Sequence, residues 1–208
     1  AGIEAVEDAL GIVPPLNAKL TRSLMNQSLF MHDHVVHFYH LHGLDWVDVV
    51  SALDADEAKA SKEAFNYSKA PIATGENDLK KVKQRVKEFV DKGQLGPFAN
   101  AYWGHKTYRF TPEQNLILLS HYLKALEVQR DLAKLMAIFG GKQPHPQSLT
   151  VGGVTCIMDL LDPSRMGEYL TLFKKGADFV ENAYQADVIM AAQVYKDEPS
   201  VTAQAGIM

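Results

Sequence analysis

Residues 16–43 read LNAKLTRSLMNQSLFMHDHVVHFYHLHG, and this stretch carries most of what the sequence says about the fold. Its apolar residues recur every three to four positions, which predicts one long helix that ends near His42, with Gly43 as its C-terminal cap. Five of the eight histidines of the 208-residue chain lie within eleven residues of this helix. The stretch therefore predicts both a helical fold and a candidate functional site.

Further helices are predicted after this stretch and before it. Thr111, Pro112 and Glu113 favour a helix start, because they supply a capping hydroxyl, a proline at the first position and an acid in the first turn. That helix is expected to end at Gly140 and Gly141. Apolar spacing predicts other helices in residues 3–11, 76–92 and 165–195. We therefore predict a mainly α fold of long packed helices, with irregular functional loops between them.

Composition restricts the function classes. Hydrophobic residues make up 47% and charged residues 22% of the chain, values typical of a globular protein with a buried core. The net charge is −4 and no basic block is present, so neither nucleic-acid binding nor direct membrane attachment is indicated. No apolar run reaches about 18 residues, so no membrane-spanning helix is expected.

Three single residues have simple interpretations. Cys156 is the only cysteine, which excludes an intrachain disulfide and any metal site built from several cysteines of this chain. Its apolar neighbours predict a buried thiol. Trp46 and Trp103 are interpreted as anchors in the core or at an interface.

The histidine-rich helix allows three interpretations. On an α-helix Asp33, His37 and His40 share one face, and His32 and His42 point elsewhere. Imidazoles in this arrangement suit a metal site, a proton relay beside a carboxylate, or a helix–helix interface with satisfied hydrogen bonds. The spacing matches no defined metal-ligand pattern, so the residues alone leave all three open.

A loop rich in glycine and proline follows the helix that begins at Pro112. Residues 139–148 read FGGKQPHPQS, and residues 151–154 read VGGV. Paired glycines permit positive φ or close backbone approach, and the prolines on both sides of His145 fix where its ring points. The spacing of a phosphate-binding loop is absent, so a rigid connector without a ligand remains an alternative. The apolar residues 154–161 predict a short strand or a turn.

Four motifs are spread over nearly the whole chain, in residues 17–24 (NAKLTRSL), 32–48 (HDHVVHFYHLHGLDWVD), 93–98 (GQLGPF) and 139–154. In order and approximate spacing they resemble the large, catalytic subunit of nickel–iron hydrogenases of the respiratory uptake type. The resemblance implies part of that large-subunit fold, with residues 1–208 as the central portion of a single domain. It also implies an enzyme that reversibly splits molecular hydrogen into protons and electrons.

The sequence departs from this family at the metal ligands. In the family, nickel and iron are held by four cysteines in two Cys-x-x-Cys pairs, and Cys156 matches neither pair. The resemblance therefore implies an internal segment with no metal ligand of its own, and we expect the segment alone to be inactive. The nickel–iron centre with its diatomic ligands, and magnesium as a further ion, are expected in the full-length subunit.

The motifs also assign candidate site residues. Asp33 matches the family's acidic residue beside the metal centre, and His32 and His37 match nearby positions with orienting and proton-handling roles. His145 matches the histidine at the boundary with the small subunit, where a hydrogen-bond donor would tune the nearest iron–sulfur cluster. The resemblance implies an iron–sulfur small subunit as partner in a heterodimer, and a periplasmic location with membrane association only through partners.

Two alternatives from other classes stay open. The first is a metal-free subunit of a redox complex, related to the quinone-side subunit of respiratory complex I, whose full gene would lack the cysteine pairs. The second is a non-catalytic helical metal-binding protein, which would take up metal through the histidines of this chain alone. The dense histidine helix favours the hydrogenase.

Overall fold

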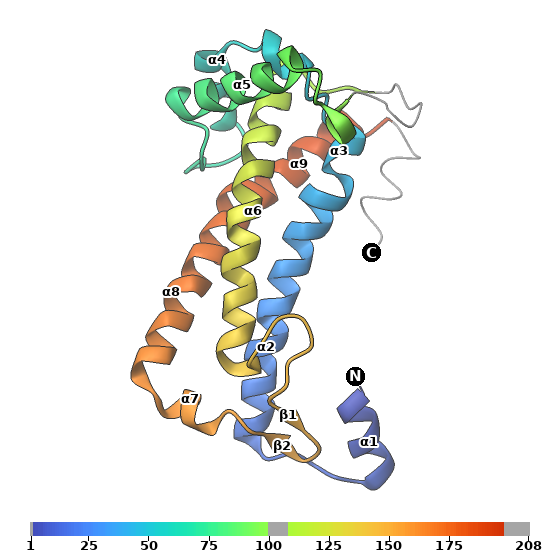
Figure 1. Ribbon diagram of the computed structural model, residues 1–208, viewed down its shortest axis with the longest axis vertical. Coiled ribbons are helices and arrows are strands. Elements are labelled where there is room, and N and C mark those ends of the chain that lie inside the picture. Colours follow the sequence, from blue (N-terminus) through green and yellow to red (C-terminus); the bar gives the residue numbers. More distant parts are fainter. Residues whose placement is uncertain (1, 100–107, 198–208) are drawn as a thin grey trace. The chain divides into compact units, whose positions relative to one another are not determined.

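The computed structural model describes residues 2–99 and 108–197, and Trp103 lies outside them (Figure 1). The described residues are mainly helical, which confirms the predicted fold class. None of the described helices is both long and apolar enough to cross a membrane. The helices are α1 (Gly2–Leu10), α2 (Leu16–Val35), α3 (Gly43–Trp46), α4 (Glu57–Ala64), α5 (Glu76–Asp91), α6 (Pro112–Gly140), α7 (Ile157–Leu161), α8 (Pro163–Phe179) and α9 (Gln185–Val194).

Short segments of other geometry complete the described chain. Two are π-helical, η1 (Val36–His42) and η4 (Val180–Tyr184), and each follows directly on an α-helix. Two are 3₁₀-helical, η2 (Ser51–Asp54) and η3 (Gly96–Phe98). The strands are β1 (Leu149–Thr150) and β2 (Gly153–Val154).

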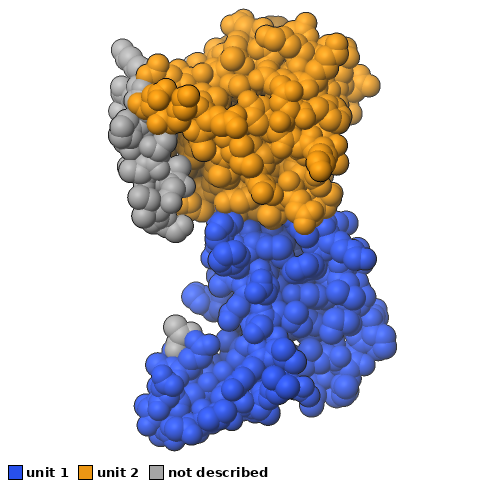
Figure 2. Space-filling model, turned by 180° about the vertical axis from the view of Figure 1, so that it is seen from behind, with its two compact units in different colours: residues 1–34, 127–177 blue, residues 35–126, 178–208 orange. Residues whose placement is uncertain are grey.

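The chain divides into two compact units, shown in different colours in Figure 2. Unit 1 comprises residues 1–34 and 127–177, and unit 2 comprises residues 35–126 and 178–208. Each unit is therefore built from two stretches that are far apart in the sequence. Helix α6 contributes residues to both units.

Unit 1 contains a buried aromatic contact and a small hairpin. Phe139 near the end of α6 packs against Tyr169 of α8, with ring centroids 5.1 Å apart. Strands β1 and β2 pair antiparallel, and Gly152 in the turn between them has a φ of +87°. That φ lies in the left-handed region, which glycine adopts without a steric penalty. Residues 154–161, predicted as a short strand or a turn, form the end of β2 and then α7.

Unit 2 is organised around the first half of α6. Thr111 caps this helix as predicted, because its hydroxyl accepts from the Gln114 N–H at 3.2 Å and the Gln114 side chain accepts from the Thr111 N–H at 3.1 Å. Helix α5 buries Leu79 and Val86 against the same core and exposes most of its charged residues, as its amphipathic pattern predicted. Trp46 packs against this core, which agrees with its interpretation as an anchor.

The prediction that Gly43 ends the histidine-rich helix is wrong. Gly43 directly follows η1, but it has the right-handed helical angles φ −53° and ψ −40°, and the chain continues from it into α3. In unit 2 the segment before it packs on α6, where the His40 and Tyr122 rings lie 5.1 Å apart. Long-range packing therefore overrides the local stop signal that a glycine supplies.

Candidate functional site

The second half of the histidine-rich stretch lies on the π-helical turn η1. Hydrogen bonds in a π-helix join residues five apart instead of four. His37 and His42 are five apart, and their ring centroids lie 4.5 Å from each other. The prediction that His42 points away from His37 is therefore wrong, because the wider turn replaces the three- and four-residue spacing of an α-helix.

Asp33 and His32 form a hydrogen-bonded pair on α2 in unit 1. The Asp33 Oδ1 atom lies 2.9 Å from His32 Nδ1, and the side chains are 63% and 18% exposed, respectively. A carboxylate hydrogen-bonded to an imidazole suits a proton-transfer role, because the carboxylate fixes the orientation of the ring. The proton-handling roles of Asp33, His32 and His37 stay predictions.

A buried charged cluster in unit 2 is absent from the predictions made from sequence. Asp187 Oδ2 accepts a hydrogen bond from the Tyr39 hydroxyl at 2.6 Å and lies 2.7 Å from His121 Nδ1. The other ring nitrogen of His121 lies 2.8 Å from the carbonyl oxygen of Ile72. A carboxylate and a carbonyl only accept hydrogen bonds, so both ring nitrogens carry hydrogen and His121 is an imidazolium.

The electrostatics agree with this assignment. Burial lowers the pKa of His121, but the charge of Asp187 and the hydrogen bonds to Asp187 and Ile72 oppose it, and the net pKa is raised. Burial is also the main reason that the pKa of Tyr39 is well above its usual value, so its hydroxyl stays a donor. Asp187 is 66 residues from His121 and 148 from Tyr39, and no local pattern signals such a pairing.

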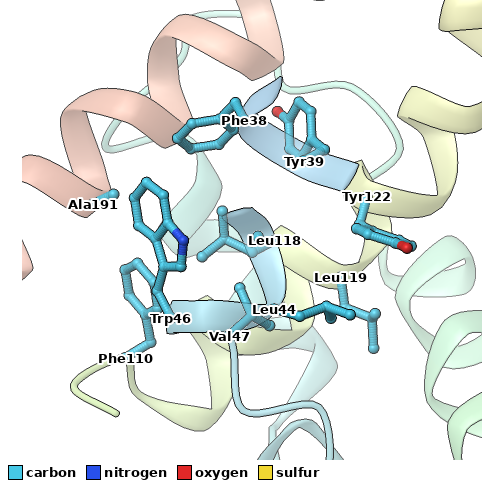
Figure 3. Close-up of a pocket in the computed structure, with 11 residues that line it drawn as sticks. Phe38, Tyr39, Leu44, Trp46, Val47, Phe110, Leu118, Leu119, Tyr122 and Ala191 are labelled. Carbon is cyan, nitrogen blue, oxygen red and sulfur yellow. The ribbon is translucent and has the colours of Figure 1, made fainter. Parts of the chain in front are cut away.

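An apolar pocket lies beside Tyr39 within unit 2. In Figure 3 the rings of Phe38, Trp46 and Phe110 lie along one side of it and Tyr122 lies on the other. The pocket encloses about 360 Å³ when the part open to solvent is included. Its lining is almost wholly hydrocarbon and aromatic, so it offers few polar groups to orient a ligand.

In unit 1 the loop that carries His145 is braced against the end of α6. The Gln147 N–H donates to the Gly140 carbonyl at 2.7 Å. A Cβ atom on Gly140 would lie 2.8 Å from Cβ of Pro146, so only glycine permits this approach. His145 has a φ of +62°, which is uncommon for a residue with a side chain and is concentrated at functional positions. The predicted rigidity of this loop thus has a geometric basis.

The following hairpin is fixed by a second contact in unit 1. Arg22 of α2 forms two hydrogen bonds with Glu7 of α1, at 2.7 and 2.8 Å, and also donates to the carbonyl oxygens of Thr150 and Gly153. Glu7 in turn accepts from the Gly152 N–H at 2.7 Å. The hydrogen bond from Arg22 is the main reason that the pKa of Glu7 is lowered to about 2. This ion pair joins both helices to the hairpin.

The described residues do not fit a resident metal centre. Within 2–99 and 108–197, no three His, Cys, Asp or Glu side chains come together to hold a metal ion. Cys156 is buried, as predicted, and burial raises the pKa of its thiol, whereas a metal ligand must be a thiolate. Among the residues that the structure describes, no set of side chains could hold a metal centre by itself.

Comparison with known proteins assigns the family. The sequence model described as nickel-dependent hydrogenase matches residues 1–208. The chain belongs to the nickel-dependent hydrogenase family. This hydrogenase segment is 72% identical to the quinone-reactive Ni/Fe-hydrogenase large chain of Wolinella succinogenes, over 97% of its own length and 35% of the relative's.

More distant relatives give the same family. The hydrogenase segment is 46% identical to an uptake hydrogenase large subunit of Alcaligenes hydrogenophilus, with 95% of this chain and 33% of the relative covered. A structure of the Ni-Fe-Se hydrogenase of Desulfovibrio vulgaris Hildenborough matches with a TM-score of 0.62 and 27% identity, over 90% of this chain and 29% of that chain. The chain spans about a third of the length of these relatives. The resemblance is confirmed, and neither alternative class finds support among these matches.

Proposed function

We propose that the complete protein is the catalytic large subunit of a hydrogenase that reversibly splits molecular hydrogen into protons and electrons. The observation that carries this proposal is the 72% identity to a Ni/Fe-hydrogenase large chain across 97% of this chain. The match covers 201 residues of the chain, so the matched region includes the helix of Asp33 and the loop of His145. The activity belongs to the complete subunit, of which these 208 residues form one part.

In this proposal the segment supplies the surroundings of the reaction and no metal ligand. A nickel–iron centre with diatomic ligands would supply the chemistry of hydrogen, held by residues outside this chain. Asp33 and His32 would hold and orient a proton beside it, and His37 would take part in moving that proton. Their geometry supports the roles, because Asp33 is largely exposed and is already hydrogen-bonded to an imidazole. Magnesium would be a further ion of the complete subunit.

The partner in this proposal is an iron–sulfur small subunit, which carries electrons away from the reaction. His145 would lie at the boundary with that subunit, where a ring N–H can tune a nearby cluster. Unit 1 also exposes large apolar side chains on α7, with Ile157, Met158 and Leu161 exposed by 62%, 75% and 72%. Exposed apolar side chains grouped in this way support burial against further protein in the assembled enzyme.

The location in this proposal is periplasmic, with membrane association through partner proteins. The support is indirect and comes from the names of relatives, one called quinone-reactive and another called an uptake hydrogenase. A quinone-reactive enzyme delivers electrons to a membrane-soluble acceptor. Fractionation of the native cells, with hydrogenase activity assayed in periplasmic, membrane and cytoplasmic fractions, tests this assignment.

The direct test expresses the complete gene with that of its small subunit. The purified complex should contain nickel and reduce a viologen dye with hydrogen, and a complex with neither property would refute the proposal. The variant Asp33→Asn should lower turnover by roughly 100-fold, a typical contribution of a proton-transferring group. The matched control is Asp91→Asn, since Asp91 is 59% exposed and paired with Lys87, much as Asp33 is 63% exposed and paired with His32. Equal activity of the two variants would remove Asp33 from the site.

A further inference from the structure

We propose that the buried cluster of Tyr39, Asp187 and His121 is a positioning element. It fixes the π-helical turn η1 and thereby sets the orientation of His37 and His42. This proposal rests on the proposed function only for the role of His37 in moving a proton. The structural role itself follows from contacts within unit 2.

The first step is the anchor in the middle of η1. Tyr39 is the fourth of the seven residues of this turn, and only 2% of its surface is exposed. Its hydroxyl donates to the Asp187 carboxylate at 2.6 Å. Hydrogen bonds to a charged acceptor are roughly twice as strong as neutral ones. The centre of η1 is therefore held at one defined point by a strong directional contact.

The second step is the packing between the two π-helical turns. The Phe38 and Tyr184 rings lie 5.4 Å apart, and the Tyr39 and Tyr184 rings lie 6.4 Å apart, so η1 and η4 are in contact. Asp187 lies in the first turn of α9, directly after η4. π-helical turns are rare and are frequent at functional sites. Here the aromatic contacts join η1 to η4, and the hydrogen bond from Tyr39 to Asp187 joins η1 to α9, the helix that follows η4.

The third step is the contribution of His121, which acts through Asp187. A carboxylate at this depth needs a partner, because burial of an unpaired charge is costly. The imidazolium of His121 supplies the opposite charge at 2.7 Å, and the Ile72 carbonyl holds its other nitrogen at 2.8 Å. His121 and Tyr39 thus both contact Oδ2 of Asp187, and His121 fixes the position of the carboxylate that accepts from Tyr39.

The consequence concerns the rings exposed by η1. His37 and His42 are neighbours only because the turn is π-helical, since an α-helix would place His37 beside the residues three and four positions later. Loss of the anchor would let the turn relax toward α-helical spacing and separate the two rings. The 4.5 Å distance between their centroids is therefore a local indicator of the state of η1.

The test uses the complete large subunit in complex with its small subunit. Tyr39→Phe removes the anchoring hydroxyl and retains the ring and the ion pair. The matched control is Tyr169→Phe in unit 1, because Tyr169 is also 2% exposed and donates to the Leu24 carbonyl at 3.1 Å. Two readouts are recorded: amide hydrogen exchange in residues 36–42, and the ring signals of histidines labelled with carbon-13, assigned with His37→Gln and His42→Gln.

In Tyr39→Phe we expect about a tenfold or greater loss of amide protection in residues 36–42, with shifted ring signals of His37 and His42. In Tyr169→Phe both readouts should match the wild type. Unchanged protection in Tyr39→Phe would overturn the proposal, and so would lost protection with unmoved ring signals, because the cluster would then stabilise the core without orienting the rings. Neither readout depends on turnover, so a complex without hydrogenase activity would refute the proposed function and leave this test intact.

Discussion

Replacing Gly140 by alanine should displace the loop that carries His145. The added Cβ atom would lie 2.8 Å from Cβ of Pro146, and real Cβ contacts are rarely shorter than 3.4 Å, so the proline ring must retreat by about 0.6 Å. The side chain of Pro146 is a rigid ring, and the backbone next to it is held by the hydrogen bond from the Gln147 N–H to the Gly140 carbonyl. The side chain therefore cannot rotate out of the way, and the loop itself must move.

The magnitude follows from a comparison with a second glycine in unit 1. Gly167 lies within α8 and has no atom within 4 Å of an added Cβ, so Gly167→Ala should stabilise the helix by roughly 0.5–1 kcal/mol. Gly140→Ala gains at most the same amount and incurs an overpacking cost of about 1–3 kcal/mol. The two variants should thus differ by about 1–3 kcal/mol, which corresponds to roughly 5- to 150-fold in a local opening equilibrium.

The assay is amide hydrogen exchange in the complete complex, read at residues 141–148. Protection of the Gln147 amide should fall in Gly140→Ala and stay unchanged in Gly167→Ala. If the proposed role of His145 is right, the reduction potential of the nearest iron–sulfur cluster should shift in Gly140→Ala alone. Equal protection of the Gln147 amide in both variants would refute the reasoning, because the close approach of Pro146 would then not restrain the loop.

Two further predictions concern pH. The hydrogen bond from Arg22 holds the pKa of Glu7 near 2 instead of 4.5, so its stabilisation is present above pH 4.5 and lost as the pH falls toward 2. Glu7→Gln should therefore lower the thermal midpoint at pH 7, and the gap to the wild type should close on acidification; a gap independent of pH would argue against the ion pair. The pKa of His121 is raised, so the pH dependence has the opposite sign. The stabilisation is complete below pH 6.5 and is lost as the pH rises through the pKa of His121 in the folded protein. The midpoints of His121→Gln and wild type should therefore converge at alkaline pH, and divergence would contradict the imidazolium assignment.

The sequence was sufficient for the features that depend on neighbouring residues. The start of α6 was predictable because Thr111, Pro112 and Glu113 lie within one helical turn, and the structure shows the Thr111 hydroxyl capping the helix. The reciprocal bond to the Gln114 side chain was not predicted. The buried face of α5 followed from apolar spacing, and the rigidity of the loop around His145 followed from its prolines and glycines. The family was recognisable because its motifs are contiguous stretches of a few to seventeen residues.

Only the tertiary structure decided the features that join distant parts of the chain. The π-helical geometry of η1, and with it the contact of His37 with His42, depends on packing against segments more than 80 residues away, such as Tyr122 at 82 residues from His40. Asp187 reads in sequence as an ordinary helical acid, and its ion pair with His121 appears only when α6 and α9 meet. The local spacing of residues predicts a helix and its faces. It does not predict which residue pairs with a buried charge, because the fold determines that partner.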